Sequence, residues 1–380
     1  MKRRQFLSAL GLGAAVTAIT GAVGGWISSC SKKEQGQQQG TGAAAVATGK
    51  AEYDWKMVTS WPPHFPVLGE SAERIAANIQ RMSAGRMKIQ VYGGGELVPP
   101  LGTFDAVRQG NVEMGHSTSY YWAGTSPATQ FFAAVPFGMT AQQMNSWLMS
   151  GGGQALWDEL YATFNLKPFP AGNSGVQMAG WFRKEINSVA DLKGLKMRIP
   201  GLGGKVLAKL GGTVVLLAGS EVFPALERGV IDAAEWVGPY HDRRLGLHQA
   251  AKFYYYPGWH EPGTVLEFTV NKQKFDALPP ELKAIIEMAC AESNGWALAE
   301  LEAQNSGALQ DLVQNQGVSV KPLPDDVLRA LKKASRETLE EIAAADPASK
   351  KVYDSFKKFQ ADNDRWADIS ERAYQRALKL

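Results

Sequence analysis

The sequence predicts an α/β protein with two lobes, a central cleft and a long helical extension at the C-terminus. Three observations support this fold class. Short strand-like segments alternate with amphipathic helical segments over most of the chain, a helix–glycine–strand unit occurs twice, and the residues from Asp325 onward are charged and helical. About 330 residues follow Tyr53, which is enough for two lobes with separate cores.

The expected elements of the first half follow one another in order. YDWKMVTSW, from Tyr53, is predicted as a strand, and ESAERIAANIQRMSAG as an amphipathic helix that ends at Gly85. MKIQVYGGG is the next strand, a helix from Pro100 to Gln109 stops at Gly110, and VEMGHSTSYYW runs as a strand into a loop. This alternation is typical of α/β proteins.

One helix–glycine–strand unit occurs twice. FDAVRQGNVEMG, Phe104 to Gly115, aligns without gaps with FPALERGVIDAA, Phe223 to Ala234. In both, a helix ends at a glycine, which suits a left-handed C-terminal cap, and a short strand with an acidic residue follows. Two such units about 120 residues apart predict two lobes of like topology. Coincidence is the alternative, because the pattern is common.

A cleft between the lobes is the expected ligand site, and the residues just beyond the two repeated strands would face it. HSTSYYWAG, after the first unit, contains Tyr120, Tyr121 and Trp122. EWVGPYHDRR, after the second, begins with Glu235 and Trp236. Aromatic residues at strand ends are often packing residues, but here they recur at the same relative position.

The chain ends in charged helices with no strand between them. Apolar residues follow one another at helical spacing, for example Val327, Leu328 and Leu331, and then Val352, Phe356 and Phe359. In one interpretation these helices fold back across both lobes as a strut. In the other they also reach a second copy of the chain.

The first 30 residues are predicted to be an export signal, with a basic start, an apolar run and small residues after it. Arg3 and Arg4, followed by Gln-Phe-Leu, resemble the twin-arginine type, which is exported folded. An uncleaved membrane anchor is the alternative, which the many glycines and alanines disfavour. Ile27-Ser-Ser-Cys30 resembles a bacterial lipobox, in which Cys30 becomes lipidated, and a competing cleavage site lies in AAAVATGKA, Ala43 to Ala51.

The segment over residues 31–50 is polar and rich in Gly and Gln, so it is predicted as a flexible tether. The other cysteine, Cys290, lies in a helical segment, where burial as a small apolar residue is expected, since a disulfide to Cys30 would be odd. The chain has 40 basic and 37 acidic residues and no block of like charges, which argues against a nucleic-acid surface. The ligand is therefore expected to be small.

The sequence lacks the common catalytic motifs. Its five histidines are scattered without an HExxH pattern, GGGEL and GLGGK lack the context of a phosphate or dinucleotide loop, and no Gly-x-Ser-x-Gly occurs. Twin-arginine export is a hint of a cofactor enzyme, although some binding proteins use it too. We therefore expect a binding protein and not an enzyme.

SVADLKGLKMRIPG, GNSGVQMAGWF and FPALERGVIDAAEW together resemble the periplasmic substrate-binding proteins of tripartite ATP-independent (TRAP) transporters, the DctP-like family, and in particular its branch that binds 2-oxo acids and related monocarboxylates. The resemblance covers nearly all of the mature chain. It implies a periplasmic location and the two-lobed periplasmic binding protein fold, while Cys30 and the tether depart from freely diffusing members. The binding protein of an ATP-driven importer is the alternative, against which the pairing of DLKGLKMR with ERGVIDAAEW argues.

The resemblance implies that Arg198, which ends DLKGLKMR, binds the carboxylate of the ligand. A planar guanidinium forms two parallel charge-assisted hydrogen bonds that a lysine cannot reproduce, and Ile199-Pro-Gly201 would fix the backbone after it. Pyruvate, lactate and longer 2-oxo acids all offer a carboxylate and an α-oxygen. Pocket volume would select among them, set by residues such as Tyr120, Tyr121, Trp181 and Phe223.

The resemblance also implies a metal ion that contacts the ligand, held by Gln177, Glu235 and the backbone carbonyl of Trp236. All three are oxygen donors, which suits Na⁺ or Ca²⁺ better than zinc. A cation would also remove the repulsion between Glu235 and a bound anion. A solvated loop position for Glu235 is the alternative. Asn173 and Glu261 are further candidates for contacts with the ligand or the metal.

The expected boundaries place residues 51–172 and 269–324 in the first lobe, 173–268 in the second and 325–380 in the C-terminal helices. Crossing segments near Gly172 and Thr269 would join the lobes, and a bridging ligand would shift an open–closed equilibrium. The closed protein would then dock on the membrane subunits of the transporter. Because related proteins of the 2-oxo acid branch form dimers through exchanged C-terminal helices, a homodimer is also expected.

Overall fold

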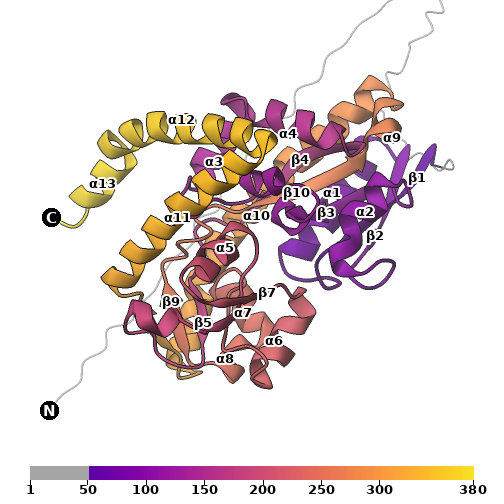
Figure 1. The fold of residues 1–380 in the computed structure, drawn as a ribbon. Helices are drawn as coiled ribbons and strands as arrows, with labels where there is room; N and C mark the ends of the chain where they lie inside the picture. Colours follow the sequence, from indigo (N-terminus) through magenta and orange to yellow (C-terminus); the bar gives the residue numbers. More distant parts are fainter. Residues whose placement is uncertain (1–50) are drawn as a thin grey trace, which may run out of the picture. The chain divides into compact units, whose positions relative to one another are not determined.

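The structure is a computed structural model, and it describes residues 51–380 (Figure 1). The predictions for the export signal, for lipidation of Cys30 and for the tether over residues 31–50 lie outside the described residues. Within residues 51–380, no helix has the length and apolar character that a membrane span requires.

The first lobe is built on a five-stranded mixed sheet with the strand order β2-β1-β3-β10-β4. Strand β1 runs parallel to β2 and β3, and β10 runs antiparallel to β3 and β4. Apolar side chains of β1, such as Met57, pack on Ile75 and Ile79 of the helix that follows it. The elements of this lobe are β1 (Tyr53–Thr59), α1 (Leu68–Met82), β2 (Met87–Tyr92), η1 (Pro100–Gly102), α2 (Thr103–Arg108), β3 (Met114–Ser117), η2 (Ser119–Trp122), η3 (Pro127–Phe132), α3 (Ala141–Ser150), α4 (Gly153–Ala162), β4 (Leu166–Asn173), β10 (Val265–Asn271) and α9 (Lys272–Asp276).

The second lobe is built on a six-stranded sheet with the order β11-β9-β5-β8-β6-β7. Strand β6 runs parallel to β7 and β8, and β5 runs antiparallel to β8 and β9. The elements of this lobe are β5 (Gly180–Phe182), η4 (Val189–Leu192), β6 (Lys196–Arg198), α5 (Gly201–Lys209), β7 (Thr213–Val215), α6 (Gly219–Glu227), β8 (Ala233–Ala234), α7 (Pro239–Leu245), α8 (Leu247–Ala250), β9 (Phe253–Tyr256) and β11 (Ser319–Pro322).

The two sheets share one topology. The order β2-β1-β3-β10-β4 corresponds to β7-β6-β8-β5-β9, with the same three parallel strands followed by two antiparallel pairings. Only β11, parallel to β9, has no counterpart in the first sheet. The predicted α/β fold with two lobes of like topology is therefore confirmed.

The repeated sequence unit forms the same local structure in both lobes. It corresponds to α2 and β3 in the first lobe and to α6 and β8 in the second. Gly110 and Gly229 adopt left-handed φ angles of 77° and 71°. The residue after each glycine donates its backbone N–H to the carbonyl of Ala106 at 3.0 Å or of Ala225 at 2.9 Å. The glycine is required because this φ is strained for other residues.

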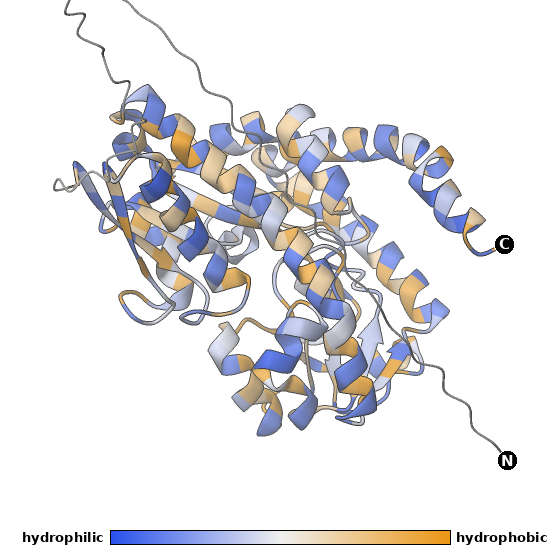
Figure 2. Ribbon diagram, turned by 180° about the vertical axis from the view of Figure 1, so that it is seen from behind, coloured by the Kyte–Doolittle hydropathy of each residue, from blue (hydrophilic) through white to orange (hydrophobic). Residues whose placement is uncertain are grey.

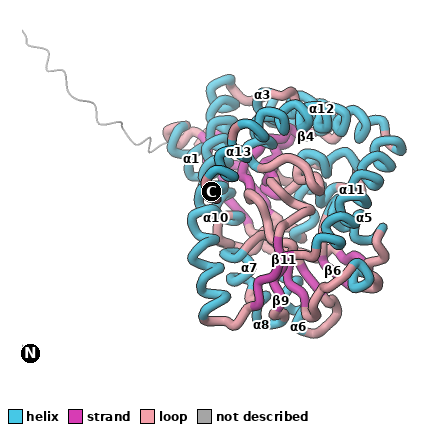
Figure 3. The backbone as a smooth tube through the Cα atoms, turned by 90° about the vertical axis from the view of Figure 1, so that its left-hand side faces the viewer, coloured by secondary structure: helices cyan, strands magenta, loops and turns pink. Residues whose placement is uncertain are grey.

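Helix α10 (Pro280–Gln314) connects the two lobes. Its 35 residues give a length of about 50 Å, enough to pass both sheets, as Figure 3 shows. Ile286 lies in the core of the first lobe, and Leu301 lies in the core of the second.

The structure differs from the expected boundaries in two places. The first sheet resumes at Val265, where β10 begins, and not at residue 269. The range 269–324 also does not lie wholly in the first lobe, because α10 carries the chain across and β11 then pairs with β9 of the second sheet.

The C-terminal helices bridge both lobes. They are α11 (Asp325–Ala345), α12 (Pro347–Ile369) and α13 (Glu371–Ala377). Leu331 of α11 packs in the second lobe, whereas Leu339 of α11 and Phe356 of α12 pack in the first. The strut interpretation therefore describes their arrangement. Figure 2 shows both apolar and polar residues along the helices that lead to the C-terminus. Trp366 and Ile369 of α12 and Tyr374 of α13 are exposed.

Candidate functional site

Arg198 and Glu235 lie at the ends of two neighbouring parallel strands of the second lobe. Arg198 is the last residue of β6 and pairs in register with Ala234 of β8, so Glu235 follows directly beside it. The backbone N–H of Glu235 donates to the carbonyl of Arg198 at 3.2 Å. Because parallel strands end at the same sheet edge, the register of β6 and β8 places the two side chains together.

Arg198 and Glu235 form a buried ion pair. Their side chains are 1% and 0% exposed, and Arg198 Nη1 donates to Glu235 Oε1 and, at 3.0 Å, to the Glu235 backbone carbonyl. Nε donates to the carbonyl of Leu217 at 3.3 Å, and the guanidinium carbon lies 5.0 Å from the ring centroid of Trp236. Burial lowers the pKa of Arg198, but the acidic groups around it, Glu235 first and then Tyr121, Tyr120 and Glu261, together outweigh burial and the net pKa is raised. Arg198 therefore stays cationic.

Aromatic residues that follow β3 in the first lobe contact the Arg198–Glu235 ion pair. Nη2 of Arg198 donates to the Tyr121 hydroxyl at 3.3 Å, and the Tyr120 ring lies 4.8 Å from the Tyr121 ring, nearly perpendicular to it. Burial raises the pKa of both phenols, so they remain protonated. Gly201, at φ 59°, leaves no room for a side chain, because a Cβ there would lie 2.9 Å from Tyr120 Cβ. Glycine at this position thus lets the arginine strand approach the first lobe.

Gln177 lies on the segment between β4 and β5, and Glu261 lies on the segment between β9 and β10. These two segments cross between the lobes, and the two side chains bind each other. Gln177 Nε2 donates to Glu261 Oε2 at 2.8 Å, to Ser174 Oγ at 3.0 Å and to Thr264 Oγ1 at 3.2 Å. Gln177 Oε1 is buried and accepts no hydrogen bond within the described residues. Burial, and then the charge of Glu235, raise the pKa of Glu261 to about 7.

These residues fit a cation site. Glu235, His260 and Glu261 are all buried and each offers a ligand atom within 4.8 Å of the others. His260 Nε2 lies 3.2 Å from Glu235 Oε2. The unpartnered Gln177 Oε1 adds an oxygen ligand, and the backbone carbonyl of Trp236, which directly follows Glu235, is a further oxygen ligand. A donor set rich in carboxylate and amide oxygens suits Na⁺ or Ca²⁺.

A small pocket brings most of the predicted ligand residues together. Tyr120, Tyr121, Gln177 and Trp236 line it, which places substrate candidates from both lobes and the crossing segment around one space. Further lining residues are Trp61, Leu68, Ser174, Val237, Thr264 and Leu266.

Asn173 is buried but does not line this pocket. Its Oδ1 accepts from Gly175 N at 2.9 Å, and its Nδ2 donates to the Gly263 carbonyl at 3.3 Å. Asn173 thus connects the two crossing segments. A change at Asn173 would affect the ligand by moving these segments and not by loss of a direct contact.

Trp181 and Phe223 lie away from the pocket, contrary to their expected role in setting its volume. Trp181 stacks on Tyr254 with ring centroids 4.0 Å apart and donates from Nε1 to Asp242 at 2.9 Å. Phe223 packs against the core of the second lobe. Both aromatic side chains pack in or against the core of the second lobe, where burial of their apolar surface is favourable.

Trp61 and His260 were not predicted as site residues. Trp61 follows β1 and donates from Nε1 to His116 Nδ1 at 2.8 Å. Trp61 lies two residues after β1, an inner strand of the first sheet, as Trp236 lies two residues after β8. This position just beyond an inner strand was the signal that could have identified Trp61 as a site residue. His260 directly precedes the predicted Glu261, and the sequence WHEPG was the available signal.

The chain matches known proteins over most of its length. Residues 57–346 match the family described as bacterial extracellular solute-binding protein, family 7 (DctP). The chain is 44% identical over 375 residues to the monocarboxylate 2-oxoacid-binding periplasmic protein of Nostoc sp. strain PCC 7120, which covers 99% of this chain and 98% of that protein.

Solved structures of TRAP solute-binding proteins are similar in fold and sequence. The protein of Colwellia psychrerythraea, with bound calcium and pyruvate, has a TM-score of 0.84 and 41% identity and covers 86% of this chain and 100% of that one. The protein of Pseudoalteromonas atlantica, with bound sodium and pyruvate, has a TM-score of 0.83 and 42% identity and covers 86% and 99%. A protein of Bordetella bronchiseptica, a dimer with calcium and picolinate in one site, has a TM-score of 0.85 and 40% identity and covers 87% and 98%. With its shared topology, its paired strand-end charges and these matches, the chain belongs to the DctP family of TRAP transporter solute-binding proteins.

Proposed function

We propose that this protein captures a small 2-oxo acid such as pyruvate, or a lactate-like monocarboxylate, together with Na⁺ or Ca²⁺, and delivers it to the membrane subunits of a TRAP transporter. The observation that carries the proposal is the buried ion pair of Arg198 and Glu235 beside the unpartnered Gln177 Oε1. It provides one cationic partner for a carboxylate and several oxygen ligands for a cation. The pyruvate complexes of the two similar solved proteins, one with calcium and one with sodium, support it.

Each site residue has a distinct role in this proposal. Arg198 binds the carboxylate of the acid through two parallel hydrogen bonds. Gln177, Glu235 and the Trp236 carbonyl hold the cation, with Glu261 beside them. The cation offers the α-oxygen of the ligand a positive partner and screens its carboxylate from Glu235. No residue here forms or breaks a covalent bond.

Capture follows from the position of the site between the lobes. Tyr121 of the first lobe contacts Arg198 of the second, so a ligand held by Arg198 favours the closed arrangement. Membership in the DctP family favours a TRAP membrane complex as the partner over an ATP-driven importer.

The location and assembly of the protein form a further part of the proposal. The sequence supports export to the periplasm, with Cys30 as the lipid attachment site and residues 31–50 as the tether. The exposed apolar residues of α12 and α13, with Trp366 and Ile369 64% and 74% exposed, favour a homodimer formed through the C-terminal helices.

Calorimetry with the purified protein tests the ligand and the cation together. Pyruvate, lactate and 2-oxobutyrate are titrated into protein in calcium buffer, in sodium buffer and in a chelated choline buffer. We expect saturable binding of at least one acid in calcium or sodium and weaker binding in choline. Absence of binding for every acid in all three buffers would contradict the proposal, and mass spectrometry of molecules released from denatured native protein would then name the true ligand.

A further inference from the structure

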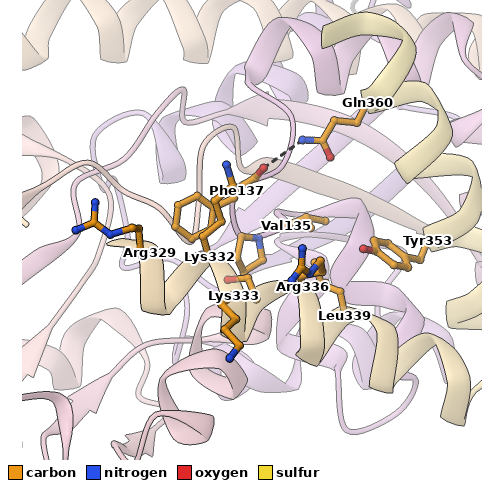
Figure 4. A pocket seen from close by; sticks show the side chains of 11 residues that line it. Val135, Phe137, Arg329, Lys332, Lys333, Arg336, Leu339, Tyr353 and Gln360 are labelled. Atoms are coloured by element: carbon orange, nitrogen blue, oxygen red, sulfur yellow. Dashed lines mark hydrogen bonds between the residues drawn. The ribbon is translucent and has the colours of Figure 1, made fainter. Parts of the chain in front are cut away.

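A second cavity lies between the C-terminal helices and the first lobe, separate from the ligand pocket. No residue lines both. Figure 4 shows its walls, which come from the segment before α3, from α11 and from α12. The lining residues are Val135, Pro136, Phe137, Arg329, Lys332, Lys333, Ser335, Arg336, Leu339, Tyr353 and Gln360.

The charge of this cavity is one-sided. Arg329, Lys332, Lys333 and Arg336 all line it, and no acidic residue does. Their spacing of three, four and seven residues places them on one face of α11. We refer to these four residues as the α11 cationic face.

Few acidic side chains neutralise the positive charges of the α11 cationic face. Of these four cations, Arg329 alone has a carboxylate of the described residues within salt-bridge distance, that of Asp325 at 3.7 Å. The exposed lysines of α12 differ, since Lys350 pairs with Asp354 and Lys358 with Asp362. Like charges three and four residues apart destabilise a helix, so an unpaired cluster of this kind is unfavourable without a partner.

The floor of the cavity is formed and rigid. Val135, Leu339 and Tyr353 are 3%, 5% and 6% exposed, so their positions are set by the core of the first lobe. Gln360 Nε2 donates to the Phe137 carbonyl at 3.1 Å and ties α12 to the segment before α3. Exposed cationic groups thus surround a fixed, mainly apolar base.

We propose that this cavity binds an anion with two or more negatively charged oxyanion groups. Arg336 and Arg329 offer planar donors that match carboxylate or phosphate oxygens, and Lys332 and Lys333 offer mobile point charges between them. Several cations around one space favour a multiply charged ligand over a singly charged one, because each anionic group then gains its own partner. The same chemistry is present in a free polyanion and in an anionic lipid headgroup.

The position of the cavity gives such a ligand a structural consequence. The start of α11 packs in the core of the second lobe, and the floor of the cavity belongs to the first. The Phe137 N–H donates to the Trp259 carbonyl at 2.8 Å, next to His260. An anion that contacts both α11 and the floor therefore connects the two lobes on a face other than the ligand pocket.

Titration calorimetry with pyrophosphate and with citrate tests the site, and co-sedimentation with phosphatidylglycerol vesicles, against phosphatidylcholine vesicles, tests the lipid source. The test variant is Lys332→Gln/Lys333→Gln. The control is Lys88→Gln/Lys184→Gln, which removes two exposed lysines elsewhere. We expect saturable binding of a polyanion or of phosphatidylglycerol vesicles that the test variant weakens by about tenfold or more and the control leaves unchanged.

The pattern of binding identifies the source of the anion. Binding of pyrophosphate or citrate in solution indicates a free polyanion, and binding of phosphatidylglycerol vesicles alone indicates a lipid headgroup. No saturable binding of any of these probes would overturn the proposal. Equal losses in the test variant and the control would also overturn it, since that result indicates general attraction to a basic protein. Circular dichroism of both variants checks that α11 is intact.

Discussion

The Arg198 guanidinium and the Glu235 carboxylate neutralise each other at the ends of β6 and β8, with both side chains fully buried. Removing one partner of a buried ion pair leaves an uncompensated charge, at a cost of about 3–5 kcal/mol. A carboxylate ligand that draws Arg198 away from Glu235 therefore needs a cation to take its place. Acid and cation should bind cooperatively.

This cooperativity is the first prediction. Pyruvate affinity should fall when calcium and sodium are removed, and Glu235→Gln should weaken binding in calcium buffer and abolish its dependence on the cation, because the carboxylate ligand is lost. Calorimetry in ion-replete and ion-free buffer measures both effects. Glu287→Gln, an exposed position on α10, is the control. Identical isotherms with and without the cations would refute the coupling.

The second prediction concerns the arginine itself. Arg198→Lys should weaken pyruvate binding by roughly 2–4 kcal/mol, because the paired hydrogen bonds are lost although the charge remains. Calorimetry gives the affinity, and thermal unfolding shows whether the variant is folded. Arg244→Lys, exposed on α7, should bind as the wild type does. An unchanged affinity of the Arg198 variant would exclude its role as the carboxylate ligand.

The third prediction concerns the contact between the lobes. Tyr121→Phe removes the hydroxyl that accepts from Arg198 Nη2 at 3.3 Å. Loss of one such bond should reduce pyruvate affinity by about 0.5–1.5 kcal/mol, since the arginine loses a partner that orients it. Tyr53→Phe, at the start of β1, is the matched control. Equal affinities of the two variants would place Tyr121 outside the ligand machinery.

The fourth prediction concerns stability and pH. Glu267 is buried in β10 and accepts hydrogen bonds from the Tyr161 hydroxyl at 2.8 Å and from Trp122 Nε1. Burial raises the pKa of Glu267 from 4.5 to about 7. Between these pH values the folded protein holds one more proton than the unfolded chain, so stability decreases as the pH rises.

This loss should be on the order of 3 kcal/mol between pH 4.5 and pH 7, and Glu267→Gln should lack it. Urea unfolding followed by tryptophan fluorescence at several pH values gives the free energy of unfolding for both proteins. The difference between wild type and variant should shift in favour of the variant as the pH rises. A difference that is constant with pH would contradict the prediction.

The fifth prediction concerns the C-terminal helices and assembly. A cut at Ala345 would remove Val352, Tyr353 and Phe356 from the core of the first lobe, so it would test folding and not association. Removal of residues 365–380 instead takes away the exposed Trp366, Ile369 and Tyr374. We expect the intact protein to be a dimer and this truncation a folded monomer in light scattering. A monomeric intact protein at micromolar concentration would end the dimer hypothesis.

The sequence by itself determined the features that depend on near neighbours. The two helix–glycine–strand units at Phe104 and Phe223 were predictable, because a left-handed cap needs glycine and the apolar spacing of a helix is local. Arg198 and Glu235 were identified through motifs that resemble a family, whereas the pairing of β6 with β8 that brings them together is seen in the structure.

Only the tertiary structure decided which residues meet across the lobes. The contact of Tyr121 with Arg198 and the approach of His260 to Glu235 join residues that are far apart in the chain. The pairing of β11 with β9 depended on the length and direction of α10, and the side of the strand on which Trp181 packs depended on its neighbours in the core. Such contacts arise from the burial of surfaces between distant segments, which residue periodicity does not encode.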